Sequence, residues 1–219
     1  LCIDAFKSNV KIKTVFVTKD IVNKSNGFVN DIIKNAEESF EVSDDVMKHI
    51  SDTVSPQGIV CVCENIKPNF NITDNSKIAA LFDVADPSNL GTISRTAEAF
   101  GIDALVVCGG CDIYNPKALR ASMGAIFRLP ILCLTKDEAF GFFKDNNIKS
   151  YASTPREKAE NCINIDFSGK SAVLIGNEAN GLSDDVINAC DYAITIPMKG
   201  RAESLNAAAA ASVLLFEMV

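Results

Sequence analysis

The sequence predicts an α/β protein in two parts: a small α/β unit, followed by a larger unit whose mostly parallel sheet is flanked by helices. From residue 78 to the C-terminus, short apolar runs alternate with segments of helical periodicity, which is typical of strands joined by crossover helices. A segment rich in Pro, Asn and Ser at 67–76 breaks both periodicities. We therefore expect one domain at 1–66, a linker at 67–76 and a second domain at 77–219.

In the first unit, residues 13–18 and 58–63 are rich in β-branched residues and predict strands. Apolar residues at helical spacing predict a helix over 28–40. Ser43 is placed to cap a second helix, which runs through Ile50.

In the second unit, we predict strands at 78–82, 104–107, 131–134, 150–152, 172–176 and 192–196. Helices are predicted at 90–100, 116–123, 138–144, 183–189 and 203–218. The alanine run at 207–211 fits a helix that packs closely on a neighbour.

The composition is that of a globular protein, and it limits the chemistry. The 219 residues are 47% hydrophobic and 22% charged, and 21 Lys and Arg against 28 Asp and Glu give a net charge of −7. The single histidine, His49, excludes Ser-His-Asp triads and zinc sites with several histidines, and we expect no metal. No apolar run reaches the roughly 18 residues of a membrane helix, and the first residues lack a signal-peptide pattern. We expect a soluble, cytoplasmic protein with no membrane partner.

The eight cysteines lie mostly in apolar runs, where a reduced cysteine behaves as a small hydrophobic residue. We therefore predict mostly buried thiols. The C-x-x-C stretch at 108–111 has no second ligand pair at zinc spacing, and we interpret it as a turn at the end of a strand.

Ligands of open α/β sheets bind at the carboxyl ends of strands, so function is sought in the loops that follow them. Three such loops, at 86–95, 176–182 and 196–206, are unusually rich in glycine and polar residues. Each alone is more often a plain turn. The first loop contains neither G-x-G-x-x-G nor G-x-x-x-x-G-K-[ST], which counts against a Rossmann-type oxidoreductase.

Taken together and in this order, the three loops resemble the SpoU (TrmH-like) family of S-adenosylmethionine-dependent RNA ribose 2'-O-methyltransferases, in the SPOUT superfamily. The stretches are N-L-G-x-I-x-R-T-A-x-A-F-G at 89–101, I-G-N-E-x-x-G-L at 175–182, I-P-M at 196–198 and E-S-L-N at 203–206. The stretch R-A-S-M-G-A at 120–125 is also similar. Residues 10–66 look like the latter part of the family's substrate-binding domain, whose opening we expect to be missing.

The resemblance implies a trefoil-knotted fold, a homodimer and S-adenosylmethionine as the cofactor. Backbone groups of the knot would bind the adenosine at Gly176, Ile196 and Leu205. Further cofactor contacts would come from Asn177, Met198, Ser204, Asn206 and Thr154. Arg95 matches the family's proposed catalytic residue, and Asn89 and Glu178 are associated polar positions.

The acidic total is unusual for a protein that binds RNA, although basic residues beside the motifs can form one local basic surface. The candidates for RNA contact are Lys117, Arg120, Arg128, Lys199 and Arg201. Since arginine is normally protonated, we interpret Arg95 as an electrostatic stabiliser, while its use as a general base stays open. The substrate-binding domain favours ribosomal RNA as the acceptor. Transfer RNA, and a non-catalytic RNA-binding or ribosome assembly factor of the same fold, are the alternatives.

Overall fold

The computed structural model describes residues 1–24, 27–51, 53–156 and 158–219. They form two compact units, Leu1–Lys67 and Pro68–Val219. Residues 68–76, most of the segment expected as a linker, contain neither helix nor strand. Among the described residues, no helix combines the length and the apolar composition needed to cross a membrane.

Unit 1 is a three-stranded sheet with helices packed on it. Its strand order is β2-β1-β3, in which β1 (Ile12–Val17) is parallel to β2 (Glu38–Glu41) and antiparallel to β3 (Ile59–Cys63). The helices are α1 (Cys2–Lys7), α2 (Lys19–Lys24), α3 (Phe28–Asn35) and α4 (Asp44–Ile50). The N-cap prediction is confirmed, because the Ser43 side chain accepts a hydrogen bond from the Val46 N–H.

The predicted helix at 28–40 is wrong in its second half. α3 ends at Asn35, and Phe40 lies in β2 opposite Phe16 of β1. The two rings stack with centroids 5.6 Å apart. Such a cross-strand pair stabilises a sheet, and the spacing of apolar residues along one segment cannot reveal its partner in another.

Unit 2 contains a seven-stranded sheet of parallel pairs, in the order β6-β5-β4-β9-β7-β10-β8. The strands are β4 (Lys77–Phe82), β5 (Ala104–Cys108), β6 (Ile131–Cys133), β7 (Lys149–Ser153), β8 (Glu160–Asn161), β9 (Ser171–Ile175) and β10 (Tyr192–Thr195). The helices are α5 (Pro87–Ala99), α6 (Pro116–Ser122), α7 (Lys136–Asp145), α8 (Asp184–Ala189) and α9 (Ala207–Met218). The predicted α/β class with a mostly parallel sheet is confirmed.

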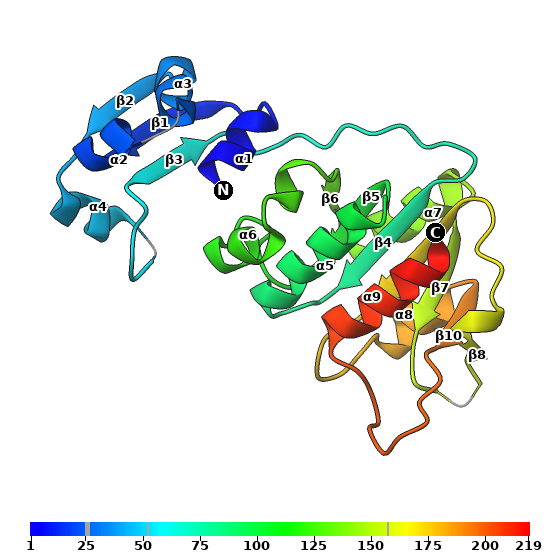
Figure 1. Ribbon diagram of the computed structural model, residues 1–219. Coiled ribbons are helices and arrows are strands. Elements are labelled where there is room, and N and C mark those ends of the chain that lie inside the picture. The colour runs from blue at the N-terminus through cyan, green and yellow to red at the C-terminus, as the bar shows by residue number, and fades with distance from the viewer. Residues whose placement is uncertain (25–26, 52, 157) are drawn as a thin grey trace. The chain divides into compact units, whose positions relative to one another are not determined.

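Both faces of this sheet are covered. Ala79 and Leu81 of β4 belong to the core that α5, α6 and α9 close, and Figure 1 shows α5 and α9 side by side on that face. Ile78 and Ala80 belong to the core that α7 and α8 close on the other face. Burial on both faces explains why the central strands β4, β5 and β9 are nearly continuous apolar runs in the sequence.

The last helix begins at Ala207, four residues later than predicted. The side chain of Asn206 accepts hydrogen bonds from the N–H groups of Ala208 and Ala209, at 2.9 and 3.3 Å. A side chain that caps the helix in this way sits at a residue outside the helical conformation. Residues 203–206 therefore belong to the preceding loop.

The prediction of mostly buried thiols is wrong. Only Cys108 and Cys162 are buried, five cysteines are partly exposed, and Cys133 is exposed. Cys133 ends β6, an edge strand of the sheet, so an apolar run in the sequence does not guarantee cover on all sides.

Candidate functional site

Three chain segments meet where β7, β9 and β10 end. β7 lies between β9 and β10, and all three run parallel, so their carboxyl ends share one edge of the sheet. Thr154 follows β7, Gly176 follows β9, and Ile196 follows β10. The structure thus brings together two of the loops selected from the sequence, 176–182 and 196–206.

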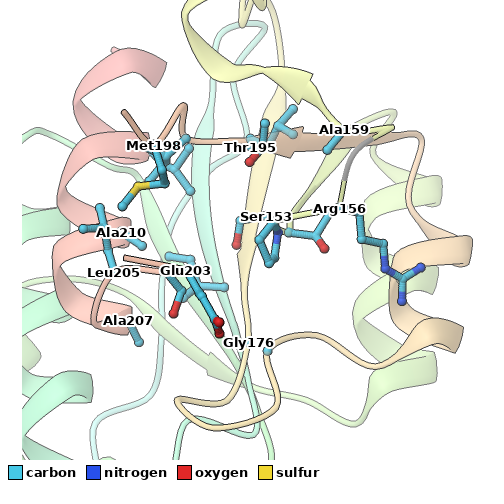
Figure 2. A pocket seen from close by; sticks show the side chains of 18 of the residues that line it. Ser153, Arg156, Ala159, Gly176, Thr195, Met198, Glu203, Leu205, Ala207 and Ala210 are labelled. Atoms are coloured by element: carbon cyan, nitrogen blue, oxygen red, sulfur yellow. The ribbon is translucent and has the colours of Figure 1, made fainter. Parts of the chain in front are cut away.

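These segments enclose a cleft of about 500 Å³. One wall is α9, whose small side chains Ala207 and Ala210 leave room beside the helix (Figure 2). Met198 and Leu205 of the loop after β10 lie next to this wall. Small-molecule sites typically have volumes of about 300–1,000 Å³ and mostly apolar walls, and this cleft is of that kind.

Gly176 determines the shape of the loop after β9. A Cβ atom at this position would lie 2.2 Å from the backbone carbon of Gly181, so a larger residue does not fit. Asn177 and Gly181 exchange two backbone hydrogen bonds, at 3.1 and 2.8 Å. The Asn177 side chain donates to the carbonyl of Asp83 at 2.9 Å and accepts from the Ala179 N–H at 2.9 Å. The loop is thereby closed on itself and fastened to the end of β4.

Glu178 joins this loop to the start of α5. Its carboxylate accepts hydrogen bonds from the N–H groups of Ala85 and Asp86, both at 3.0 Å, and from Asn89 Nδ2 at 2.8 Å. Burial alone would raise the pKa of Glu178, but the hydrogen bonds from Asn89 and from backbone N–H groups outweigh it and hold the pKa below 4.5. Glu178 is therefore an ionised group that positions backbone.

Asn206 extends this connection to the third loop. Its Nδ2 donates to Asn89 Oδ1 at 3.1 Å, while its Oδ1 caps α9. A continuous chain of hydrogen bonds therefore runs from Glu178 through Asn89 to Asn206. It ties together the three segments that the sequence singled out, although 86–95 is not a loop, because α5 begins at Pro87.

Two family models match the chain. The description "SpoU rRNA Methylase family" matches residues 76–216, and "RNA 2'-O ribose methyltransferase substrate binding" matches residues 1–68. The chain belongs to the SpoU rRNA methylase family. The predicted resemblance is confirmed.

The chain is also similar to two proteins named as 23S rRNA 2'-O-methyltransferases. The chain is 29% identical over 208 residues to the 23S rRNA (guanosine(2553)-2'-O)-methyltransferase RlmP of Bacillus subtilis, covering 94% of this chain and 83% of that protein. It is 38% identical over 152 residues to the 23S rRNA (uridine(2479)-2'-O)-methyltransferase of Streptomyces viridochromogenes, covering 65% of this chain and 52% of that protein.

Solved SpoU structures share the fold. The methyltransferase AviRb of Streptomyces viridochromogenes, in complex with the cofactor AdoMet, superposes with a TM-score of 0.88 at 25% identity, covering 98% of this chain and 84% of that one. An AdoMet-bound rRNA methyltransferase from Sinorhizobium meliloti gives a TM-score of 0.86 at 29% identity, covering 99% and 83%.

The cleft collects most of the residues that the SpoU resemblance assigns to the cofactor. The lining residues among them are Gly176, Ile196, Leu205, Asn177, Met198, Ser204 and Thr154. Asn206 does not line the cleft, because its side chain is held between Asn89 and the first turn of α9. The Asn177 side chain is likewise engaged, with the Asp83 carbonyl and the Ala179 N–H, and its backbone N–H and carbonyl are paired with Gly181.

The three residues predicted to be catalytic do not all line the cleft. Glu178 lines the cleft, whereas Asn89 is buried behind it and Arg95 does not line it. Arg95 lies on the exposed side of α5. Within the described part of the chain, its guanidinium has no hydrogen bond or ion pair. Glu178 is therefore bonded to backbone and Asn89, and not to Arg95.

The five basic residues predicted to contact RNA have different surroundings. Lys117 Nζ pairs with Asp86 at 3.0 Å, and Arg128 forms two hydrogen bonds with Glu98, at 2.6 and 3.1 Å. Arg120 lies on α6. Lys199 and Arg201 are exposed on the loop after β10, beside the cleft. Intramolecular ion pairs thus reduce the charge that Lys117 and Arg128 offer to a phosphate.

Sequence reasoning missed several lining residues. Arg156 extends from the segment after β7 at the edge of the cleft opposite α9 (Figure 2). It pairs with Asp184 at the start of α8. Its position directly after a strand end was the available signal. Ala207 and Ala210 were assigned only to helix packing. Among the residues that the structure describes, no cluster of three His, Cys, Asp or Glu side chains is arranged to hold a metal ion.

Proposed function

We propose that this protein transfers a methyl group from S-adenosylmethionine to a ribose 2'-hydroxyl of ribosomal RNA. The observation that carries the proposal is the cleft that the segments after β7, β9 and β10 build together. Membership of the SpoU rRNA methylase family and the 23S rRNA relatives support it. Ribosomal RNA as the acceptor would place the enzyme in the cytoplasm.

The cleft fits the cofactor chemically. Its apolar walls, Ile196, Met198 and Leu205, suit an adenine ring, and Gly176 also lines the cleft. Thr154 and Ser204 supply hydroxyl groups for the polar parts of the ligand. When bound there, S-adenosylmethionine supplies a methyl group on a positively charged sulfur. We further propose the trefoil knot, which the resemblance implies, as the arrangement that brings these residues together.

Methyl transfer to a hydroxyl is an in-line displacement, so alignment of the acceptor oxygen with the methyl group contributes much of the acceleration. The chain of hydrogen bonds from Glu178 to Asn206 fixes the loops and hence this alignment. Arg95 would stabilise the charge that develops on the ribose oxygen, or would position a phosphate. In this assignment, Asn89 and Glu178 are positioning residues.

We propose a homodimer in which Arg95 serves the cleft of the partner subunit. Arg95 and Thr92 are exposed on α5, and Val213 and Phe216 are exposed apolar residues of the neighbouring helix α9. α5 and α9 are in contact, with the Phe100 and Phe216 rings 5.7 Å apart. An exposed apolar patch of this kind is typical of an interface, and a two-fold dimer would bury it against its own copy.

The test of the activity is direct. Purified protein should bind S-adenosylmethionine and transfer its labelled methyl group to unmodified large-subunit ribosomal RNA, leaving a linkage resistant to alkali. Label appearing only in transfer RNA would replace the proposed acceptor. Cofactor binding without any transfer to RNA would contradict the enzyme assignment.

The test of the dimer combines two inactive variants. Arg95→Ala should retain cofactor binding and lose transfer by at least about 100-fold, as expected for loss of a group that stabilises the transition state. Leu205→Asp should lose cofactor binding. If Arg95 acts on the partner's cleft, reassembled mixtures of the two variants should recover about a quarter of the wild-type activity, because half of the dimers contain one complete site. No recovery, despite mixed dimers, would place Arg95 at the cleft of its own subunit.

A further inference from the structure

Unit 1 has a cleft of its own. It measures about 300 Å³ and lies between α2, α4 and the segment that precedes β3. Its lining includes Thr18, Ile21, Met47, Lys48 and Gly58. None of the residues discussed for the cofactor belongs to this unit, so the methyl-transfer site does not account for this cleft.

The side chain of Thr18 is the informative feature. Thr18 lines the cleft and is only 5% exposed, and its backbone N–H donates to the carbonyl of Gly58 at 2.9 Å. Within the described residues, its hydroxyl forms no hydrogen bond, not even the helix-capping bond to the first turn of α2. Since no buried side-chain oxygen or nitrogen of the described residues lacks a partner, the Thr18 oxygen is reached from the cleft, where it is free to bond a ligand.

Gly58 keeps this hydroxyl accessible. A Cβ atom at residue 58 would lie 2.7 Å from Thr18 Oγ1 and 3.1 Å from Ile21 Cβ. The backbone there also has φ of +83°, in the region that favours glycine. Any side chain at 58 would therefore press on the hydroxyl.

The rest of the cleft combines an apolar floor with charges at the rim. Met47 is 2% exposed and Ile21 lies beside it. At the rim, Lys24 is paired with Asp20 at 3.0 Å, whereas Lys48 has no ion pair in the described part of the chain. The carboxylates of Asp20 and Asp44 also line the opening, and they disfavour the dense phosphates of a duplex.

We propose that this cleft holds one unpaired nucleotide of the RNA that the protein methylates. The base would lie on Ile21 and Met47 and receive or donate a hydrogen bond at the Thr18 hydroxyl, and its phosphate would lie near Lys48. Single-stranded bases are recognised in this way, by a contact on their flat faces and hydrogen bonds at their edges. The volume admits one nucleotide and not a helix. The proposal rests on the proposed function, and it adds a site to the substrate-binding unit.

The experiment compares Thr18→Val with Thr14→Val, using an unmodified transcript of large-subunit ribosomal RNA as the probe. Thr14 is a half-exposed threonine of β1 that does not line the cleft, so it is a matched control. Thr18→Val should raise the Kd and the KM for RNA about tenfold, as for loss of a hydrogen bond of about 1.4 kcal/mol. It should leave kcat at saturating RNA and the Kd for S-adenosylmethionine unchanged. Since the hydroxyl has no hydrogen-bond partner among the residues that the structure describes, the melting temperature should not fall.

The charge at the rim is tested with Lys48→Gln, with Lys34→Gln on α3 as the control. Lys48→Gln should weaken RNA binding and lower the slope of log Kd against log salt by about 1, as for the loss of one phosphate contact. RNA binding by Thr18→Val that equals that of Thr14→Val would overturn the proposal, while a wild-type enzyme that still methylates the transcript would leave the proposed function intact. A wild-type protein that neither binds nor methylates RNA would overturn both.

Discussion

Replacing Glu178 by glutamine should destabilise the protein and loosen the cofactor cleft. The carboxylate accepts three hydrogen bonds, from two backbone N–H groups and from Asn89. A glutamine amide has a single oxygen, so its NH2 group would face at least one of these donors. Hydrogen bonds to a charged group contribute about 1.5–3 kcal/mol each, but Glu178 is exposed and water would replace part of the loss. We therefore expect a loss of about 1–2 kcal/mol in the free energy of unfolding.

Urea denaturation at pH 7 measures this loss, and a titration of S-adenosylmethionine measures its consequence. If the loop's arrangement for binding is destabilised by about 1.4 kcal/mol, the Kd for S-adenosylmethionine should rise about tenfold. Glu203→Gln is the matched control, because Glu203 also lines the cleft and is exposed, and no hydrogen bond or ion pair holds it within the described chain. If the Glu178 and Glu203 variants are equally stable, the argument from the backbone hydrogen bonds is wrong.

The pH dependence of stability in the wild type and in Glu178→Gln gives a second test. The pKa of Glu178 in the folded protein lies below its ordinary value of 4.5. A carboxyl whose folded pKa is lowered stabilises the protein fully above the unfolded pKa and loses this contribution as the pH falls through the folded pKa. The stability difference between the wild type and Glu178→Gln should therefore be constant from about pH 7 to 5.5 and shrink below about pH 4.5. A difference that grows in acid would contradict the assignment.

Two further substitutions test the packing around the site. Gly91→Ala should lower the free energy of unfolding by about 2–3 kcal/mol, because the new Cβ atom would lie 2.4 Å from a backbone oxygen of α6. In Gly141→Ala the new Cβ atom in α7 meets nothing within 4 Å, so this variant should be more stable by about 0.5–1 kcal/mol. Thermal unfolding of both variants checks this. Asn206→Ala and Asn115→Ala each remove an N-cap, and each should lower the free energy of unfolding by about 1 kcal/mol. Only Asn206→Ala should also weaken cofactor binding, because only that cap is linked to Asn89. Equal cofactor affinities of the two variants would refute the link.

The elements that the sequence predicted well are those whose signal is local. The central strands β4, β5 and β9 of unit 2 are buried on both faces, so each is a nearly continuous apolar run with clear ends. Ser43 and the helix it caps are local in the same sense. The short strand β2 was missed because its stability comes from pairing with β1, a partner more than 20 residues away, and four exposed residues carry no pattern of their own.

The candidate site divides in the same way. The motifs identified Gly176, Ile196 and Leu205 because the residue types and their order are a sequence property, and all three line the cleft. The positioning role of Glu178 could not be predicted from the sequence. Nothing along the chain indicates that its carboxylate accepts hydrogen bonds from N–H groups 92 and 93 positions earlier.

By itself, the sequence determined the α/β class, the two units and the family, because periodicity, breaks in periodicity and ordered motifs all depend only on the order of residues along the chain. The tertiary structure alone decided which motif residues share a cleft and which stand behind it. It also left Arg95 exposed on α5 and the Thr18 hydroxyl without a partner in the described part of the chain. The reason is physical: hydrogen bonds and burial depend on distances between segments far apart in the chain, and only the packing of helices on the sheets fixes those distances.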